Sequence, residues 1–280
     1  PARTDGGPGP PRIDKLPYFP EHVLATLAGV KRLVLAGAAT PVSFFAYPDM
    51  PSELVPDGCD VVVLASGEED VGAALADLVA ALEAPTAGYA VHEAAAQDPG
   101  EGRLTTRAAA ACIANRMPDG AIFCGDSGGG GAAFAPTQQA GPNTWLNLTG
   151  GSIGQGGPAA VGAAIACPDR QVFALLGDGA SMYTIQALWT QARERLDVIT
   201  VIFSNRTYGI LETEYRRLGV NEVGDRAAAL FDLSRPDIDF SSLARGMGVN
   251  GARADSVEDF DRALTAALDA GGPHLIEAVV

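Results

Sequence analysis

Histidine and cysteine are scarce in this sequence, and their spacing excludes the common metal and disulfide frameworks. The 280 residues include three histidines and four cysteines. No two cysteines form a C-x-x-C pair, so neither a structural zinc site nor a disulfide framework is expected. The histidines, His22, His92 and His274, are scattered along the chain. A catalytic centre built on histidine is therefore not expected either.

Basic residues are also scarce, which argues against polyanionic partners. The chain has 19 Lys and Arg against 34 Asp and Glu, a formal net charge of −15. Such a charge repels nucleic-acid backbones and anionic lipid surfaces. There is no apolar run of membrane-spanning length and no basic-then-apolar leader. We expect a cytoplasmic protein that acts on a small molecule, with neither nucleic acid nor membrane as a partner.

The sequence does contain two stretches in which strand patterns alternate with helix patterns. Residues 13–85 carry two short apolar strands and two helix-like segments, and residues 104–280 carry a longer alternation. Residues 1–12 and 86–103 collect Gly and Pro and are expected to be linkers. The first linker lacks an initiator Met, which is typical of a piece of a longer chain. We predict an α/β protein with doubly wound parallel sheets in two domains.

Three glycine-rich loops could hold a phosphate group. They are GDSGGGG at 125–131, GGSIGQGG at 150–157 and GDGAS at 177–181. Backbone N–H groups can converge on an anion in such loops, and the start of a helix adds a favourable dipole. No G-x-x-x-x-G-K-[ST] motif occurs, so a nucleoside triphosphatase is excluded.

One of these loops also fits a dinucleotide-binding fingerprint. Gly154-x-Gly156-x-x-Ala159 follows an expected strand at 145–149, and Asp178 comes roughly 20 residues later, as that motif requires. However, Asp178 lies between two glycines at the start of a helix and is not free to meet a ribose. A nicotinamide-dependent oxidoreductase remains an alternative.

Asp178 can instead be paired with Asn205. The 25 residues between Gly179 and Asn205 suffice for one helix and one strand. A strand–helix–strand unit of this length places the ends of two neighbouring parallel strands at the same edge of the sheet. A carboxylate, an amide oxygen and a backbone carbonyl are suitable ligands for Mg²⁺, which also binds phosphate oxygens. A metal beside glycine-rich loops implies a bound diphosphate.

This pattern, G-D-G followed by about two dozen residues and then N-x-T, resembles the thiamine diphosphate motif of the decarboxylase and acetolactate synthase superfamily. The segments GGSIGQGGPAAVGAAIACPDRQVFALLGDGASMYTIQALWTQA, NRTYGIL and DIDFSSLARGMGV are most similar to the benzoylformate decarboxylase and acetolactate synthase-like branch. The resemblance covers residues 104–280, as the pyrophosphate-binding domain. Residues 13–85 are more weakly similar to part of the middle domain.

The resemblance implies thiamine diphosphate and Mg²⁺ as cofactors. Mg²⁺ would be bound by the side chains of Asp178 and Asn205 and by the backbone carbonyl of Thr207. The Gly151 carbonyl would accept a hydrogen bond from the aminopyrimidine, and Ile153 would support the bent cofactor, although Ile153 is equally typical of a core residue. The diphosphate would be surrounded mainly by backbone N–H groups, where any single glycine could instead serve only its turn: Ser127, Gly128, Gly129, Gly179, Ala180, Ser181 and Tyr208.

The resemblance also indicates a substrate pocket and a partner. Leu211 and Glu214 are candidates to line the pocket, although Glu214 is equally typical of a solvated helix charge. Arg206 stands where several relatives have glycine. Full family chains carry a pyrimidine-binding domain with a glutamate that acts on the cofactor, and no segment here matches it. That domain would come from a lost part of the chain or from another subunit, in a homo-oligomer of the full enzyme.

The expected activity is decarboxylation or carboligation of a 2-oxo acid, in a thiamine diphosphate-dependent C–C lyase or transferase. The alternatives are a 2-hydroxyacyl-CoA lyase of the same cofactor class, the nicotinamide oxidoreductase, and a non-catalytic assembly module.

Overall fold

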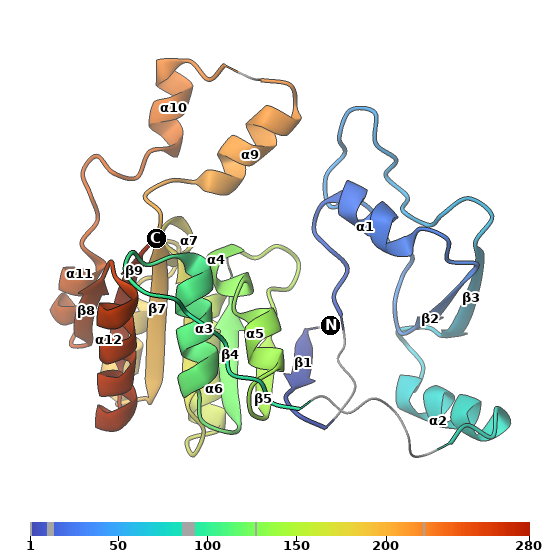
Figure 1. The fold of residues 1–280 in the computed structure, drawn as a ribbon, viewed down its shortest axis with the longest axis horizontal. Helices are drawn as coiled ribbons and strands as arrows, with labels where there is room; N and C mark the ends of the chain where they lie inside the picture. The colour runs from blue at the N-terminus through green and yellow to red at the C-terminus, as the bar shows by residue number, and fades with distance from the viewer. Residues whose placement is uncertain (1, 10–13, 86–92, 127, 221) are drawn as a thin grey trace. The chain divides into compact units, whose positions relative to one another are not determined.

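The molecule comprises two compact units in a computed structural model. Unit 1 contains Pro1–Arg12, Val91–Thr213 and Glu222–Val280, and unit 2 contains Ile13–Ala90 and Glu214–Asn221. Figure 1 shows the elements of both units along the chain. The structure describes residues 2–9, 14–85, 93–126, 128–220 and 222–280.

Unit 1 is built on a seven-stranded sheet in the order β1-β5-β4-β6-β7-β9-β8. All neighbouring strands are parallel except β1, which runs antiparallel to β5. The central strands consist almost entirely of apolar residues because they are buried on both faces. The strands are β1 (Arg3–Gly6), β4 (Ala121–Gly125), β5 (Asn143–Leu146), β6 (Val172–Gly177), β7 (Val198–Ser204), β8 (Asn250–Ala254) and β9 (His274–Val279).

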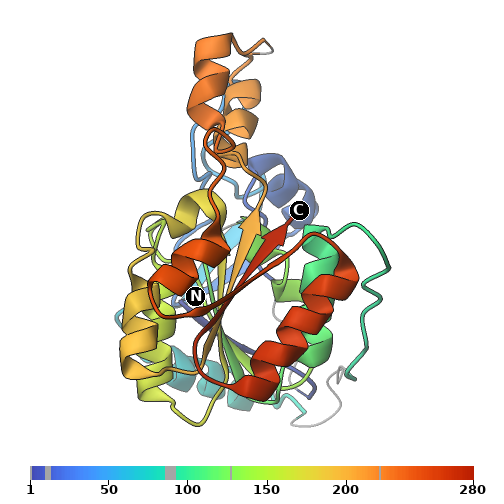
Figure 2. The same ribbon diagram turned by 90° about the vertical axis from the view of Figure 1, so that its left-hand side faces the viewer.

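Helices cover both faces of this sheet, which confirms the predicted doubly wound fold. Alternate side chains of each strand enter two separate cores: Phe123 and Phe173 pack on one side, and Ile122 and Ala174 on the other. Figure 2 shows α12 and α3 together on one side of the strands. The first core includes α3 (Thr106–Arg116) and α12 (Val257–Ala270), and the second includes α6 (Gly156–Ala166), α8 (Ala187–Glu194) and α11 (Phe240–Gly246).

The last helix of the chain begins at a side-chain cap. The Ser256 hydroxyl accepts a hydrogen bond of 3.2 Å from the backbone N–H of Asp259 at the beginning of α12. This bond satisfies one of the N–H groups that have no partner inside the helix. Among the described residues, no helix is both long and apolar enough to cross a bilayer.

Several elements differ from the sequence-based expectation. Arg3–Gly6, within the expected linker 1–12, form β1, because their backbone groups pair with the open edge of β5. Four residues carry too little periodicity to predict such a strand. The strand expected at 145–149 begins two residues earlier and ends at Leu146. In the second expected linker, residues 93–103 form no helix or extended strand, and residues 86–92 lie outside the described residues.

A helix start was expected at Asp178 and a helix was considered for Glu214, and the structure has α7 (Asp178–Ser181) and α9 (Gly209–Arg217) at these positions. Three other short helices were not predicted, because their sequences are rich in Gly or too short to show a helical period. They are α4 (Gly128–Gly131), α5 (Phe134–Gln138) and α10 (Asp225–Phe231).

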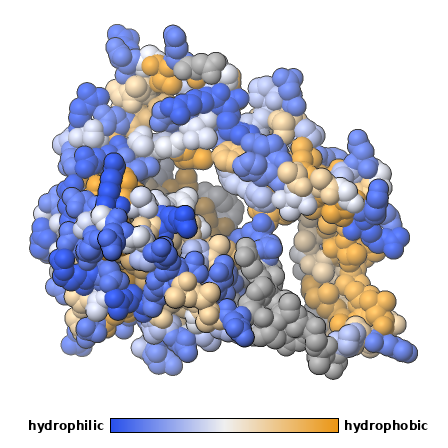
Figure 3. All heavy atoms as spheres, in the orientation of Figure 1, coloured by the Kyte–Doolittle hydropathy of each residue, from blue (hydrophilic) through white to orange (hydrophobic). Residues whose placement is uncertain are grey.

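Unit 2 is a small α/β unit with a two-stranded parallel sheet. It contains α1 (Pro20–Leu27), β2 (Arg32–Ala36), β3 (Asp60–Ala65) and α2 (Val71–Ala81). Its small core is formed mainly by Val23, Leu27 and Leu54. Figure 3 shows hydrophobic atoms at the surface over β2, β3 and α2. The exposed side chains there are Val34, Val61, Val62, Val63, Leu75, Val79 and Leu82.

Candidate cofactor site

The candidate site lies at the carboxyl ends of β4, β6 and β7. These strands are adjacent and parallel, with Gly125 opposite Leu175 and Gly177 opposite Phe203. Ligands of open α/β sheets bind at such strand ends. The neighbouring positions predicted for the strands that precede Asp178 and Asn205 are therefore confirmed.

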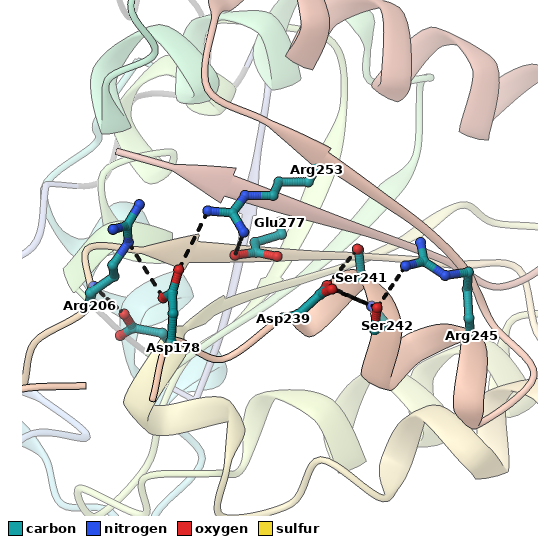
Figure 4. A network of polar contacts seen from close by, with 9 residues as sticks. Asp178, Arg206, Asp239, Ser241, Ser242, Arg245, Arg253 and Glu277 are labelled. Atoms are coloured by element: carbon teal, nitrogen blue, oxygen red, sulfur yellow. Dashed lines mark hydrogen bonds and ion pairs between the residues drawn. The ribbon is translucent and has the colours of Figure 1, made fainter. Parts of the chain in front are cut away.

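The Asp178 carboxylate connects two of these strand ends. Its side chain is buried, and Oδ1 accepts a hydrogen bond of 2.8 Å from the N–H of Gly179. Oδ2 accepts one of 2.7 Å from the N–H of Arg206, which follows β7 (Figure 4). Burial raises the pKa of Asp178, and the backbone N–H donors oppose that rise. The carboxylate is thus held in one orientation between the two loops.

The loop after β7 is fixed in a tight turn. Arg206 adopts a left-handed backbone conformation with φ of 57°. Glycine adopts this conformation without strain, whereas other residues rarely do. The Thr207 N–H donates to Oδ1 of Asn205 at 3.1 Å, and the Arg206 carbonyl accepts from the N–H of Leu233 at 2.9 Å. Residues 231–233 therefore hold the turn that carries Asn205 and Thr207.

This oxygen set fits Mg²⁺ chemically. One carboxylate, one amide oxygen and one backbone carbonyl are hard ligands, and water and phosphate oxygens complete the coordination shell of such an ion. Within the described ranges, no group of three or more His, Cys, Asp or Glu side chains could hold a metal. The predicted site contains a single carboxylate and does not depend on such a group.

Two of the three glycines predicted to surround a diphosphate are required by close packing and not by a turn. A Cβ at Gly129 would lie 2.8 Å from Cβ of Phe203, and one at Gly179 would lie 2.3 Å from the Tyr208 ring. Neither glycine has a positive φ. Gly128 has open space beside it. The short helix α4 thus begins three residues after β4 and α7 directly after β6, and Gly129 and Gly179 let them approach Phe203 and Tyr208 closely.

The other diphosphate candidates differ in what they can offer. The Ser181 hydroxyl donates to the Asp178 carbonyl at 2.8 Å, so that hydroxyl is already engaged. Ala180, next to it in α7, can offer only backbone groups to a ligand. Tyr208 packs its ring against Gly179. Ser127 lies outside the described residues.

The loop between β5 and α6 carries the residues predicted to contact the aminopyrimidine. Gly151 has φ of 67°, and its carbonyl accepts the N–H of Ile153 at 2.9 Å. A carbonyl oxygen has a second lone pair for another donor. The Ile153 side chain is 50% exposed, so it is not a core residue of this chain. Both residues are thus placed where a ligand can reach them.

The two substrate-pocket candidates lie in different compact units. Leu211 and Glu214 are both on α9, but Leu211 belongs to unit 1 and Glu214 to unit 2. The Glu214 carboxylate accepts a hydrogen bond of 3.1 Å from the Tyr47 hydroxyl. Burial is the main cause that raises the pKa of Tyr47 to about 12, and the hydrogen bond to Glu214 is the second cause. Glu214 is therefore a paired, half-buried group, and Leu211 is exposed.

Sequence patterns missed one buried carboxylate at this edge. Asp126 follows β4 and is 6% exposed, and its Oδ2 accepts the N–H of Gly156 at 3.0 Å. The residue lay inside a loop noted only for its glycines. The available signal was an acidic residue directly after an apolar strand, which is the same signal that identified Asp178.

A charged network extends from the site to the edge of the sheet (Figure 4). Asp237 lies 3.6 Å from Arg206 and 3.7 Å from Arg253, and Arg253 lies 3.8 Å from Glu277. Glu277 is 1% exposed. No sequence pattern marks Asp237, Arg253 or Glu277, because their contacts join segments far apart in the chain.

The geometry does not support the dinucleotide alternative. That alternative requires the Asp178 carboxylate to bind ribose hydroxyls. It also requires the strand before the glycine-rich loop to lie beside the strand before Asp178, whereas β4 separates β5 from β6 in this sheet.

Comparisons with known proteins identify the family. Residues 124–278 match the model described as thiamine pyrophosphate enzyme, C-terminal TPP binding domain. IlvX of Mycobacterium tuberculosis, which bears the name of an acetolactate synthase large subunit on a provisional basis, is 49% identical over 100% of this chain and 54% of its own length. A benzoylformate decarboxylase of Pseudomonas aeruginosa is 39% identical over 57% of this chain and 29% of its own length.

A solved structure gives the same result for the fold. The thiamine diphosphate-dependent 4-hydroxybenzoylformate decarboxylase of Rhodococcus jostii RHA1 matches with a TM-score of 0.76 and 29% identity, over 95% of this chain and 51% of that protein. The chain thus spans about half the length of the relatives that match it over most of its residues. It belongs to the thiamine pyrophosphate enzyme family and contains the C-terminal domain by which that family binds its cofactor.

Proposed function

We propose that the chain forms the middle and diphosphate-binding part of a thiamine diphosphate- and Mg²⁺-dependent enzyme that decarboxylates or ligates a 2-oxo acid. The observation that carries the proposal is the buried Asp178 carboxylate, bonded to the N–H of Arg206 in the turn that also bears Asn205 and Thr207. Asp178, Asn205 and the Thr207 carbonyl are the proposed metal ligands.

The proposed contacts come from backbone groups near the ends of β4 and β6 and from the loop after β5. Backbone N–H groups of Gly128, Gly129 and the start of α7 would bind the diphosphate. The Gly151 carbonyl would orient the aminopyrimidine, and the half-exposed Ile153 would exclude water beside it. When bound, thiamine diphosphate supplies the nucleophile and the electron sink for cleavage next to a carbonyl. Leu211 and Glu214 are proposed to contribute to substrate binding.

The proposed enzyme needs a partner. Because the matched relatives are about twice as long as this chain, we infer that a pyrimidine-binding domain is supplied by further polypeptide of the same protein or by another subunit. A homo-oligomer of the full enzyme would then complete each site. The net charge of −15 supports a small-molecule substrate without nucleic-acid or membrane partners, and we propose a cytoplasmic location.

Isothermal titration calorimetry tests the cofactor assignment. We expect the chain to bind thiamine diphosphate in the presence of Mg²⁺ and not to bind NAD. Asp178→Ala should weaken that binding at least tenfold and reduce its dependence on Mg²⁺. Asp169→Ala is the matched control, because Asp169 is exposed and precedes the same strand at its opposite end. Binding of NAD alone, or unchanged binding in Asp178→Ala, would contradict the assignment.

A further inference from the structure

Asp126 is a buried carboxylate whose environment is costly for an ionised group. It follows β4, and burial is the main cause that raises its pKa, while backbone groups of Gly156 and Gly154 lower it. Its Oδ1 has no hydrogen-bond partner among the described residues. A buried carboxylate with an unsatisfied oxygen destabilises a fold, so Asp126 calls for an explanation in structure or function.

The contacts of Asp126 join two loops of the candidate site. The residue lies between β4 and α4, beside the glycines proposed to bind the diphosphate. Its Oδ2 accepts the N–H of Gly156, the first residue of α6, at 3.0 Å. Gly156 directly follows the loop that carries Gly151 and Ile153. A carboxylate at the start of an 11-residue helix is also favoured by the helix dipole.

The close approach at this point leaves no room for a side chain. A Cβ at Gly156 would lie 3.1 Å from Cγ of Asp126 and 2.5 Å from Cδ2 of Leu176. On the other side, the hydroxyl of Thr184 donates to the Gly154 carbonyl at 2.6 Å. Residues 154–156 are therefore held between Asp126, an acceptor that follows β4, and Thr184, a donor that follows α7.

We propose that Asp126 is a positioning residue that holds the 150–156 loop against the end of β4. It thereby fixes the spacing between the groups that bind the diphosphate and the groups that bind the aminopyrimidine. The part of this proposal that concerns the cofactor rests on the proposed function. The mechanical part, in which Asp126 orders the loop, does not.

Hydrogen exchange of the chain without cofactor tests the mechanical part. In Asp126→Ala, the amide of Gly156 and its neighbours at 154–155 should exchange about tenfold faster than in the parent. Asp126→Asn should retain most of the protection, because its amide oxygen can still accept the Gly156 N–H. Asp197→Ala is the control: it removes a half-buried carboxylate whose Oδ1 also has no hydrogen-bond partner among the described residues, but which precedes β7 at the end of the sheet away from the site. Unchanged exchange in Asp126→Ala would overturn the proposal.

Calorimetric titration with thiamine diphosphate at saturating Mg²⁺ tests the positioning part. We expect Asp126→Ala to raise the Kd about tenfold, Asp126→Asn to raise it less than threefold, and Asp197→Ala to leave it unchanged. Faster exchange with an unchanged Kd would reject the positioning role. If the parent itself binds no thiamine diphosphate, the proposed function fails while hydrogen exchange still decides the mechanical part. If Asp126→Ala does not fold, Asp126→Leu removes the acceptor while filling the space, and the same outcomes apply.

Discussion

The Asp178 carboxylate accepts a 2.7 Å hydrogen bond from the N–H of Arg206, 28 residues further along the chain. This single contact links the ends of β6 and β7 and fixes the turn on which Asn205 and Thr207 lie. The metal site proposed here is therefore organised by backbone geometry before any ion binds. Preorganised ligands lower the cost of ordering on binding.

The left-handed conformation of Arg206 predicts the effect of replacing it by glycine. Arg195 has the same conformation at the end of α8, with φ of 53°. Relief of this strain should stabilise Arg195→Gly by about 1 kcal/mol. The stability gain of Arg206→Gly should be smaller than that of Arg195→Gly, because Arg206→Gly also loses the exposed contact with Asp237. The difference between the two gains should be up to ~1 kcal/mol.

Urea denaturation of both variants measures the difference. A larger gain for Arg206→Gly than for Arg195→Gly would mean that the contact with Asp237 is unfavourable. A loss of stability in both variants would mean that the left-handed conformation carries no strain at these positions.

Two glycines in the first turns of α4 and α7 should respond differently to substitution by alanine. Gly179→Ala places a methyl group 2.3 Å from the Tyr208 ring, so it should destabilise the fold by about 1–3 kcal/mol or displace the ring. Gly128→Ala meets open space and should change stability by less than about 0.5 kcal/mol. Thermal unfolding compares the two, and equal effects would refute the packing argument.

Replacing the buried Glu277 by glutamine should increase stability in a pH-dependent way. Burial is the main cause that raises its pKa above the ordinary value of 4.5, and Arg253 opposes the rise. Between the ordinary pKa of the unfolded state and the raised pKa of the folded state, the folded state binds more protons than the unfolded state. The free energy of unfolding therefore falls as pH rises through this range. Glu277→Gln removes that loss. It should raise Tm at pH 7 by a few degrees, about 1 kcal/mol, and have little effect at pH 4.

Scanning calorimetry at both pH values checks the sign for Glu277. Asp255→Asn, at an exposed position after β8, is the control and should show no such difference. An equal gain at pH 4 and pH 7 would mean that the ionised form of Glu277 is not the source of the cost.

The exposed apolar surface of unit 2 predicts dye binding. A two-stranded sheet is at most marginally stable by itself, and parallel strands are normally covered on both faces. Val63 and Leu82 are 62% and 68% exposed. We expect the chain to bind the fluorescent dye ANS in its native state and the double variant Val63→Thr, Leu82→Gln to bind it less. Two substitutions of exposed apolar residues in unit 1, Ile165→Thr and Trp189→Gln, should have a smaller effect.

Much of the sheet was predictable because parallel strands buried on both faces are continuous apolar runs. The strands at 172–177 and 198–204 are such runs, and the structure has them as β6 and β7. The strand β1 could not be predicted, because RTDG has no strand pattern and becomes extended only by pairing with β5. In the same way, the glycine-rich segment 128–131 was expected to be a loop and forms the short helix α4.

The sequence by itself determined the doubly wound alternation, the family, and the spacing that puts Asp178 and Asn205 on neighbouring strand ends. These features depend on local periodicity and on motifs that are continuous in the chain. Only the tertiary structure decided that Asp126 reaches Gly156, that Glu214 is paired with Tyr47, and that Glu277 is buried beside Arg253. Such contacts join residues far apart in sequence, and their energies depend on burial, which no local pattern records.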